Sequence, residues 1–418
     1  MTMNTLSLRA PSRNINETIQ LTGSKSESNR ALIIRALSKG KVDIKNLSEA
    51  ADTVTLEAAL ESARQNGAEQ ESIIDIGPAG TAMRFLTAYL PLAKGSFILT
   101  GSERMKQRPI GILSDAMQAL GAFIDFADEP GFPPLHIQGG FEQKASEIDI
   151  QGDVSSQYIS ALLLIASALP GGLKLNIVGE LTSRPYVEMT LAMLAEAGIQ
   201  HTWNGQQITI APQQARESQL YIEPDWSAAS YWYAIAALSE SASIQLPGLR
   251  PHSLQGDQAI ADIMLDLGVV TLFTENGLSL TKIDQRRVKD LYDFKSYPDL
   301  AQTVIACCAA LGIETGFTGL ETLKIKETDR ILALQNELAK FGVKLYEAES
   351  GIYRLDCSGK FTPERLQIKT YEDHRMAMAF APLALVFDEL VIEEPAVVEK
   401  SYPLFWEHLE KVNFKIQP

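Results

Sequence analysis

Residues 191–210 read LAMLAEAGIQHTWNGQQITI and contain the pattern that decides the fold. An amphipathic helix ends at Gly198, and two short β-like runs follow around an Asn-Gly turn. Glycine is the expected residue just past a helix end, because the left-handed backbone there costs it least. Asn-Gly is typical of a tight hairpin turn. This stretch therefore predicts a helix followed by a β-hairpin.

The same pattern recurs five more times, at intervals of 54 to 77 residues. The other helix-ending residues are Gly67, Gly121, Gly268, Gly342 and Asn413. A more apolar helix with polar residues in its first turn precedes each amphipathic helix. These apolar segments cover residues 24–37, 77–90, 155–169, 225–238, 298–311 and 372–385. We therefore predict six copies of an α/β unit, each with one buried and one amphipathic helix.

Composition limits the class of protein. The chain has 418 residues, enough for two or three domains. Its net charge of −15 argues against general binding to nucleic acid or to an anionic membrane. Three cysteines, Cys307, Cys308 and Cys357, form neither a metal-binding spacing nor a disulfide framework. No apolar leader is visible and no stretch reaches the ~20 residues that span a bilayer. We expect a cytoplasmic protein without a metal or cofactor.

Several cations lie in or near the first turns of the apolar helices, where the helix dipole disfavours positive charge. They are Lys25, Arg30, Arg84 and Arg375. Such an arrangement favours a bound anion between the cations and the helix ends. Helix capping is the simpler interpretation for Ser156, Asp225 and Asp299 taken singly.

Together, the motifs predict that charged side chains from both halves of the chain meet near six helix ends. The cations are Lys25, Arg30, Arg108, Lys326, Arg330, Arg375 and Lys400. Asp299 and Glu327 lie among them in the sequence and are candidates for proton transfer. The predicted site would accept a substrate with more than one anionic group and could support acid–base chemistry.

Nine features, in register from about residue 23 to Lys400, resemble the EPSP synthase family of enolpyruvyl transferases. They are SKSESNR, GPAGTAMR, QRPIG, GDVSSQY, SRPY, YPDLA, KETDR, DHRMAMA and the late Lys400. The resemblance implies a two-domain α/β fold of six βαβαββ units, three per domain. Residues 23–224 would form one domain, and residues 1–22 with 225–418 the other. The buried helices would direct their N-termini toward the cleft between the domains.

The resemblance also implies an activity. The family transfers the enolpyruvyl group of phosphoenolpyruvate to the 5-hydroxyl of shikimate 3-phosphate, giving EPSP and phosphate. The reaction proceeds by addition and elimination through a tetrahedral intermediate, without metal or organic cofactor. The product belongs to the route to chorismate and the aromatic amino acids. We expect these two small molecules as the partners, and a monomer.

Site residues follow from the matched motifs. For shikimate 3-phosphate the resemblance implies Lys25, Ser26, Arg30, Ser155, Ser156, Gln157, Ser183, Tyr186, Asp299 and Lys326. For phosphoenolpyruvate it implies Lys25, Gly80, Arg108, Gln157, Arg330, Arg375 and Lys400. Asp299 would be the base near the 5-hydroxyl, Glu327 the proton donor to the methylene carbon, and Lys25 a third catalytic group.

The sequence departs from the family pattern in places. The family commonly has Asn where Pro78 stands, Pro where Phe85 stands and Asn where Thr322 stands. Two alternatives remain open. One is a non-catalytic homologue that only binds phosphorylated metabolites. The other is the sister transferase that acts on UDP-N-acetylglucosamine. That enzyme typically has a Cys in the loop before its counterpart of Arg108, whereas residues 101–108 here read GSERMKQR and contain no Cys.

Overall fold

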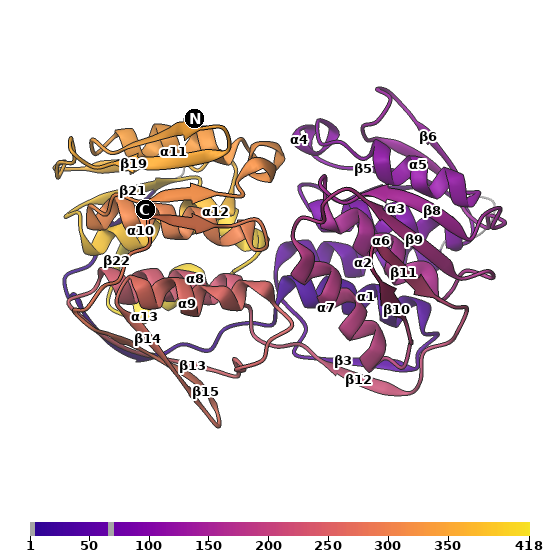
Figure 1. The fold of residues 1–418 in the computed structure, drawn as a ribbon, viewed down its shortest axis with the longest axis horizontal. Helices are drawn as coiled ribbons and strands as arrows, with labels where there is room; N and C mark the ends of the chain where they lie inside the picture. The colour runs from indigo at the N-terminus through magenta and orange to yellow at the C-terminus, as the bar shows by residue number, and fades with distance from the viewer. Residues whose placement is uncertain (1–4, 66–70) are drawn as a thin grey trace. The chain divides into compact units, whose positions relative to one another are not determined.

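The computed structural model describes residues 5–65 and 71–418. The chain divides into two compact units (Figure 1). The continuous unit comprises Gly23–Ile222, and the split unit combines the chain up to Thr22 with Glu223–Pro418. The assignment of residues 23–224 to one domain and of residues 1–22 with 225–418 to the other stays a prediction.

The second boundary lies two residues earlier than the sequence predicted. Glu223 belongs to the split unit because its buried carboxylate accepts three hydrogen bonds there. The donors are Nε1 of Trp226 at 2.9 Å, the backbone N–H of Arg250 at 2.8 Å and the hydroxyl of Ser253 at 2.6 Å.

The continuous unit contains two four-stranded sheets and, among the described residues, one two-stranded sheet. The first sheet consists of β4 (Glu71–Asp75), β5 (Ser96–Thr100), β7 (Leu135–Gln138) and β6 (Phe123–Phe126). The second consists of β8 (Glu147–Gln151), β9 (Leu173–Val178), β11 (Gln207–Ile210) and β10 (Thr202–Asn204). The third pairs β12 (Ser218–Tyr221) with β3 (Val42–Lys45).

The split unit contains three four-stranded sheets, and strands from the start of the chain complete two of them. The first consists of β2 (Asn14–Thr18), β13 (Ser241–Pro247), β15 (Gly277–Lys282) and β14 (Val269–Thr274). The second consists of β16 (Leu291–Asp293), β17 (Gly316–Thr318), β19 (Ile352–Asp356) and β18 (Lys344–Glu349). The third consists of β20 (Leu366–Ile368), β21 (Leu390–Glu393), β1 (Thr5–Arg9) and β22 (Lys415–Gln417).

All five four-stranded sheets have the same topology. The first two strands run parallel and each later neighbour runs antiparallel, as a βαβαββ unit requires. The two-stranded sheet of β12 and β3 differs from the other five. The strand that follows the helix before Gly67 is β4, and it pairs in parallel with β5 in the next sheet and does not join β12 and β3. Gly67 itself lies outside the described residues. The predicted α/β repeat is thus confirmed, with a shorter first copy.

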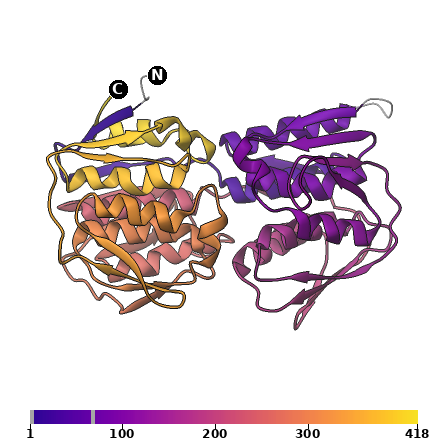
Figure 2. The same cartoon turned by 90° about the horizontal axis from the view of Figure 1, so that it is seen from above.

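Each unit has three inner helices that pack on one another, and outer helices that are buried on one face and exposed on the other. In the continuous unit the inner helices are α1 (Lys25–Leu37), α3 (Gly80–Tyr89) and α6 (Ser156–Ala166), and the outer ones are α2 (Ala51–Gln65), α5 (Gly111–Leu120) and α7 (Arg184–Glu196). In the split unit they are α8 (Trp226–Leu238), α10 (Ala301–Leu311) and α12 (His374–Phe380), with α9 (Ile260–Asp266), α11 (Arg330–Ala339) and α13 (Phe405–Lys411) outside. Figure 2 shows the inner helices of the split unit side by side.

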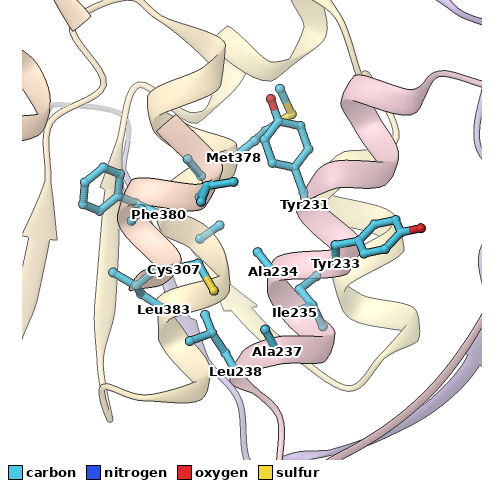
Figure 3. Close-up of a cluster of buried hydrophobic side chains, with 14 of the residues drawn as sticks. Tyr231, Tyr233, Ala234, Ile235, Ala237, Leu238, Cys307, Met378, Phe380 and Leu383 are labelled. Atoms are coloured by element: carbon cyan, nitrogen blue, oxygen red, sulfur yellow. The ribbon is translucent and has the colours of Figure 1, made fainter. Parts of the chain in front are cut away.

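The inner helices form the core of the split unit. Every residue of α8 except Ser227 is buried, and all of α12 is buried. Figure 3 shows Ala234 and Leu238 of α8 pointing toward Cys307 of α10 and Leu383. Cys307 is fully buried, and burial raises the pKa of its thiol to about 12, as expected for a small core residue. No described helix is both long and apolar enough to cross a membrane.

The helix-ending residues have the predicted backbone. Their φ angles are +113° at Gly121, +85° at Gly198, +89° at Gly268, +80° at Gly342 and +67° at Asn413. At Gly342 the chain is also crowded, since an added Cβ would lie 2.0 Å from the carbonyl oxygen of Gly359. This glycine therefore serves two purposes, a left-handed turn and a close backbone approach.

We predict that Gly342→Ala lowers the free energy of unfolding clearly more than Gly40→Ala. Both glycines have similar positive φ values, +80° and +86°, but nothing lies within 4 Å of a Cβ at Gly40. Each substitution incurs the left-handed backbone penalty of roughly 1–2 kcal/mol, and only Gly342→Ala adds a clash with backbone. Urea denaturation of both variants measures the difference, and equal losses would contradict the crowding at Gly342.

A buried hydrogen-bonded chain links α8 to α13. Trp232 Nε1 donates to the hydroxyl of Tyr402 at 3.0 Å, and that hydroxyl lies 2.7 Å from Nδ1 of His408. Because an indole N–H can only donate, the Tyr402 O–H is left to donate to a neutral His408. Burial lowers the pKa of His408 to about 4, and its side chain is almost inaccessible to solvent.

We predict that folding stability falls as the pH drops from about 6.5 to about 4, and that His408 causes part of this fall. The unfolded chain takes up a proton on His408 near its ordinary pKa of 6.5, whereas the folded chain resists protonation until about pH 4. His408→Asn retains an acceptor, does not titrate, and should flatten the profile. His252→Asn, at an exposed position, is the control and should leave the profile unchanged.

Candidate active site

In the continuous unit, Lys25 begins α1 and its ammonium is paired. Its Nζ lies 3.2 Å from Oδ2 of Asp52 on α2, and both side chains are largely buried. Ser24 caps the helix by accepting a hydrogen bond from the backbone N–H of Glu27. The ion pair holds Lys25 at the helix start, where the dipole alone would disfavour a cation.

Arg30 is buried against neutral oxygen atoms. Its N–H groups donate to the Ser26 carbonyl (2.8 Å), the Thr190 hydroxyl (2.7 Å), the Ser160 hydroxyl (3.1 Å) and the Tyr186 carbonyl (3.2 Å). Four of its five donors are thus used. Burial lowers the pKa of Arg30 to about 10, so the side chain is still charged at neutral pH.

Aromatic rings complete the surroundings of Arg30. The Cζ atom of Arg30 lies 5.6 Å from the ring centre of Phe85 and 5.8 Å from that of Tyr186. These distances allow cation–π attraction. Phe85, which departs from the family pattern, therefore contacts one of the predicted binding residues.

Gly80 and Arg108, both predicted to bind the same substrate, lie against each other. A Cβ added at Gly80 would come within 2.7 Å of Nη1 of Arg108, so the absence of a side chain makes room for the guanidinium. Nearby, Nε2 of Gln157 donates to the hydroxyl of Thr81 at 3.3 Å. This contact connects the start of α6 to the start of α3.

The remaining predicted residues of the continuous unit lie at two helix starts. Ser155 caps α6 and accepts a hydrogen bond from the backbone N–H of Gln157 at 3.2 Å, while Ser156 is the first helical residue. Ser183 precedes α7 with a left-handed backbone, φ +52°, and its carbonyl accepts a hydrogen bond from Tyr186 at 3.1 Å. Capping thus belongs to Ser155, one residue before the position the sequence suggested.

In the split unit, Arg330 is the centre of a network of ions. Its side chain is 2% exposed, and its guanidinium contacts three carboxylates. Nε lies 2.7 Å from Asp373, Nη1 lies 3.0 Å from Asp299 and Nη2 lies 2.9 Å from Glu327. A buried guanidinium of this kind needs such partners, because desolvation without them costs several kcal/mol.

Asp299 joins Arg330 to two further cations. Nη2 of Arg375 lies 2.9 Å from Oδ2 of Asp299, and Nζ of Lys326 lies 3.9 Å from Oδ1. Lys400 enters through Glu327, with a separation of 3.1 Å between Nζ and Oε1. The structure therefore brings together all six residues predicted in this unit.

The network shifts the ionisation of its members. Burial opposes the charge on Asp299, but Arg375, Lys326 and Arg330 outweigh it and hold the pKa of this carboxyl well below its usual range. Burial likewise opposes the charge on Arg330, but Asp373, Glu327 and Asp299 raise its pKa above the ordinary value. Both groups are charged at neutral pH.

The geometry of the network suits an anionic ligand. Four cations, Lys326, Arg330, Arg375 and Lys400, face three carboxylates, Asp299, Glu327 and Asp373. Helices α11 and α12 start within it, and α10 starts two residues after Asp299, so backbone N–H groups add to the positive potential. An incoming anion could replace a carboxylate as partner of a guanidinium.

Two sequence interpretations need correction. Asp299 does not cap α10, whose start has no side-chain cap, because its carboxylate is engaged by the cations. Arg84 has a structural role, since it donates to the carbonyls of Gly80 and Pro109 at 3.2 and 3.1 Å. By contrast, Asp225 caps α8 as expected, accepting from Ala228 at 2.9 Å.

Sequence reasoning did not predict the partners of these cations. Asp52 and Asp373 hold Lys25 and Arg330, and Ser160 and Thr190 hold Arg30. Asp373 could have been found from its place before an apolar helix. The others are far from their partners in sequence. That both groups of residues line one cleft also stays a prediction.

The chain is similar to known enzymes over nearly its whole length. The family model described as EPSP synthase (3-phosphoshikimate 1-carboxyvinyltransferase) matches residues 9–409. A 3-phosphoshikimate 1-carboxyvinyltransferase from Bacteroides fragilis is 49% identical over 411 residues, which cover 98% of each chain. One from Pectobacterium carotovorum is 36% identical over 428 residues, covering 96% of this chain and 97% of the relative.

Solved structures show the same fold. EPSP synthase from Acinetobacter baumannii superimposes with a TM-score of 0.76 at 20% identity, covering 99% of this chain and all of the other. The enolpyruvyl transferase NikO from Streptomyces tendae gives a TM-score of 0.72 at 14% identity, covering 99% and 98%. With the family match over nearly the whole sequence, the chain belongs to the EPSP synthase (3-phosphoshikimate 1-carboxyvinyltransferase) family.

Proposed function

We propose that this chain transfers the enolpyruvyl group of phosphoenolpyruvate to the 5-hydroxyl of shikimate 3-phosphate, releasing phosphate. The family match and the 49% identical relative support this activity. The observation that carries it is the network around Arg330, in which cations for a phosphorylated acid surround two carboxylates able to transfer protons. The enzyme is a transferase of aromatic amino acid biosynthesis.

Residues of the continuous unit bind shikimate 3-phosphate in this proposal. Lys25, Ser26, Arg30, Ser155, Ser156, Gln157, Ser183 and Tyr186 supply ammonium, guanidinium, hydroxyl and amide donors, and Asp299 and Lys326 add contacts from the split unit. Gly80, Arg108, Arg330, Arg375 and Lys400, with Lys25 and Gln157, bind phosphoenolpyruvate. Two phosphorylated carboxylates repel each other, so positive charge already in place lowers the barrier to their approach.

Asp299 is the proposed base. In the ligand-free network its pKa is too low for efficient proton removal. When the carboxylate or phosphate of phosphoenolpyruvate pairs with Arg330 and Arg375, these cations stabilise the charge on Asp299 less. The pKa of Asp299 therefore rises. Substrate binding thereby converts a structural carboxylate into a proton acceptor beside the 5-hydroxyl.

The steps balance with the residues available. Glu327 is paired with Arg330 and Lys400 as a carboxylate, and it takes up a proton as the substrate anions engage those cations. Asp299 then removes the 5-hydroxyl proton as the oxygen attacks C2 of phosphoenolpyruvate, and protonated Glu327 delivers its proton to the methylene carbon C3, which becomes a methyl group. In the elimination, ionised Glu327 takes one proton back from that methyl group, the double bond is restored and the C2–O bond to phosphate breaks. The departing phosphate takes up the proton that Asp299 received, so both carboxyl groups return to their starting states. Lys400 contacts Glu327 at 3.1 Å and stabilises its negative charge once the proton is delivered.

A non-catalytic homologue is disfavoured because Asp299 and Glu327 are both present and both within the cation network. The sister transferase acting on UDP-N-acetylglucosamine is disfavoured by the names of the close relatives. A monomeric state and a cytoplasmic location stay predictions.

We predict that Lys25→Met and Asp299→Ala each lower kcat by roughly 10²–10⁴-fold, because each removes a charge that the reaction uses. A phosphate-release assay with both substrates measures turnover, and circular dichroism checks folding. Lys45→Met and Asp290→Ala, at exposed ion pairs, are matched controls and should retain full activity. Folded variants with wild-type kcat would remove these two residues from the mechanism.

We predict that Arg30→Lys raises KM for shikimate 3-phosphate by roughly tenfold or more, since Lys keeps the charge but cannot reproduce a planar array of donors. KM for phosphoenolpyruvate should change far less. Arg35→Lys on the same helix, where an exposed Arg pairs with Glu57, is the control. Equal rises in both KM values would contradict the assignment of Arg30 to shikimate 3-phosphate.

A further inference from the structure

A chain of hydrogen bonds extends from Arg375 to a carboxylate outside the network described above. Nη2 of Arg375 donates to the hydroxyl oxygen of Ser227 at 3.5 Å, and the Ser227 O–H donates to Oδ2 of Asp257. A guanidinium can only donate, so the direction of the chain is fixed as long as Asp257 is an ionised acceptor. Nη2 of Arg375 thus donates both to Asp299 and to the Ser227–Asp257 pair, while Nη1 donates to the Asp299 carbonyl at 3.3 Å and to the Tyr231 hydroxyl at 3.4 Å.

The fold fixes this pair firmly. Ser227 lies in the first turn of α8, and Asp257 lies in the 3₁₀ helix η2 (Gly256–Ala259). Gln255 fastens that segment to the helix start: its Oε1 accepts from the backbone N–H of Trp226 at 2.8 Å, and its Nε2 donates to the Pro224 carbonyl at 2.9 Å. Asp257 is 3% exposed, so its carboxylate has little freedom to move.

We propose that Ser227 and Asp257 are positioning residues that orient the Arg375 guanidinium for the anionic groups of phosphoenolpyruvate. The inference rests on the proposed function. When substrate displaces Asp299 from Arg375, the guanidinium loses its strongest partner at the moment when its orientation matters most. The Ser227–Asp257 pair remains and keeps Nη2 in place, while the Tyr231 hydroxyl still contacts Nη1. Neither residue was among those predicted from the sequence.

The charge state of Asp257 controls this arrangement. Burial raises the pKa of Asp257 to about 6, the negative charge of Asp299 adds to the rise, and Arg375 opposes it. Asp225 adds a further repulsion, while the Ser227 hydrogen bond favours the ionised form. Above about pH 6 the carboxylate accepts from Ser227, and below it the protonated acid holds Ser227, and through it Arg375, more weakly.

The test is steady-state kinetics of Ser227→Ala and Asp257→Asn in the full-length enzyme, with both substrates varied. Ser227→Ala should raise KM for phosphoenolpyruvate roughly three- to tenfold at pH 8 and alter KM for shikimate 3-phosphate much less. Ser230→Ala is the control, because it removes a hydroxyl from the same helix that contacts the Ser227 carbonyl and Thr303. The double variant Ser227→Ala/Asp257→Asn should resemble Ser227→Ala alone, since the two residues act in series.

The pH dependence separates positioning from mere structural support. Asp257→Asn should raise KM for phosphoenolpyruvate at pH 8, and its difference from wild type should disappear by pH 5, where wild-type Asp257 is protonated. The inference is overturned if Ser227→Ala and Ser230→Ala have the same KM for phosphoenolpyruvate, or if the Asp257→Asn effect does not depend on pH. A wild-type enzyme without turnover would instead contradict the proposed function itself.

Discussion

The ion pairs of Asp299 are the interaction on which the split unit's site depends. One carboxylate holds Arg330, Arg375 and Lys326 within 4 Å, and these cations come from two segments far apart in the sequence, one with Lys326 and Arg330 and the other with Arg375. Without it, the two guanidinium groups would repel each other more strongly, and only the pairing of Arg330 with Asp373 would still link the starts of α11 and α12 through these ions. The carboxylate is therefore as much an organiser of the helix ends as a candidate base. Its two roles are compatible because a substrate anion can replace it on the guanidinium groups.

The two units stabilise their buried arginines differently. Arg30 is surrounded by hydroxyl and carbonyl oxygens, and its charge is not neutralised by them, whereas Arg330 is surrounded by carboxylates. The first arrangement keeps the guanidinium charged beside neutral oxygens, and the buried carboxylate of Glu27 also favours that charge. The second allows exchange of one anion for another and couples binding to proton affinity. This difference matches the proposed roles, in which Arg30 binds shikimate 3-phosphate and the Arg330 network binds phosphoenolpyruvate and holds Asp299 and Glu327.

Much of the fold followed from local sequence. Gly198 and its counterparts mark helix ends because few other residues adopt positive φ, and apolar helices with polar first turns indicate burial with one accessible end. The ion pairs of Asp299 could not be predicted from local sequence, because a carboxylate before a helix usually caps that helix. Its cation partners lie 27 to 76 residues away, and they engage the carboxylate instead. Asp52, Ser227 and Asp257 were missed for the same reason. The shortened first sheet could not be foreseen because register between distant strands carries little local signal.

Strand β1 has a consequence for synthesis on the ribosome. It lies between β21 and β22, so its hydrogen-bonding partners are the last strands to be made, and β2 likewise waits for β13. The continuous unit, in contrast, can close its sheets once β12 emerges. Strands β1 and β2 must therefore remain unpaired while the continuous unit, which is translated after them, folds first. A nascent chain that stops before residue 390 would have a complete continuous unit and an incomplete split unit.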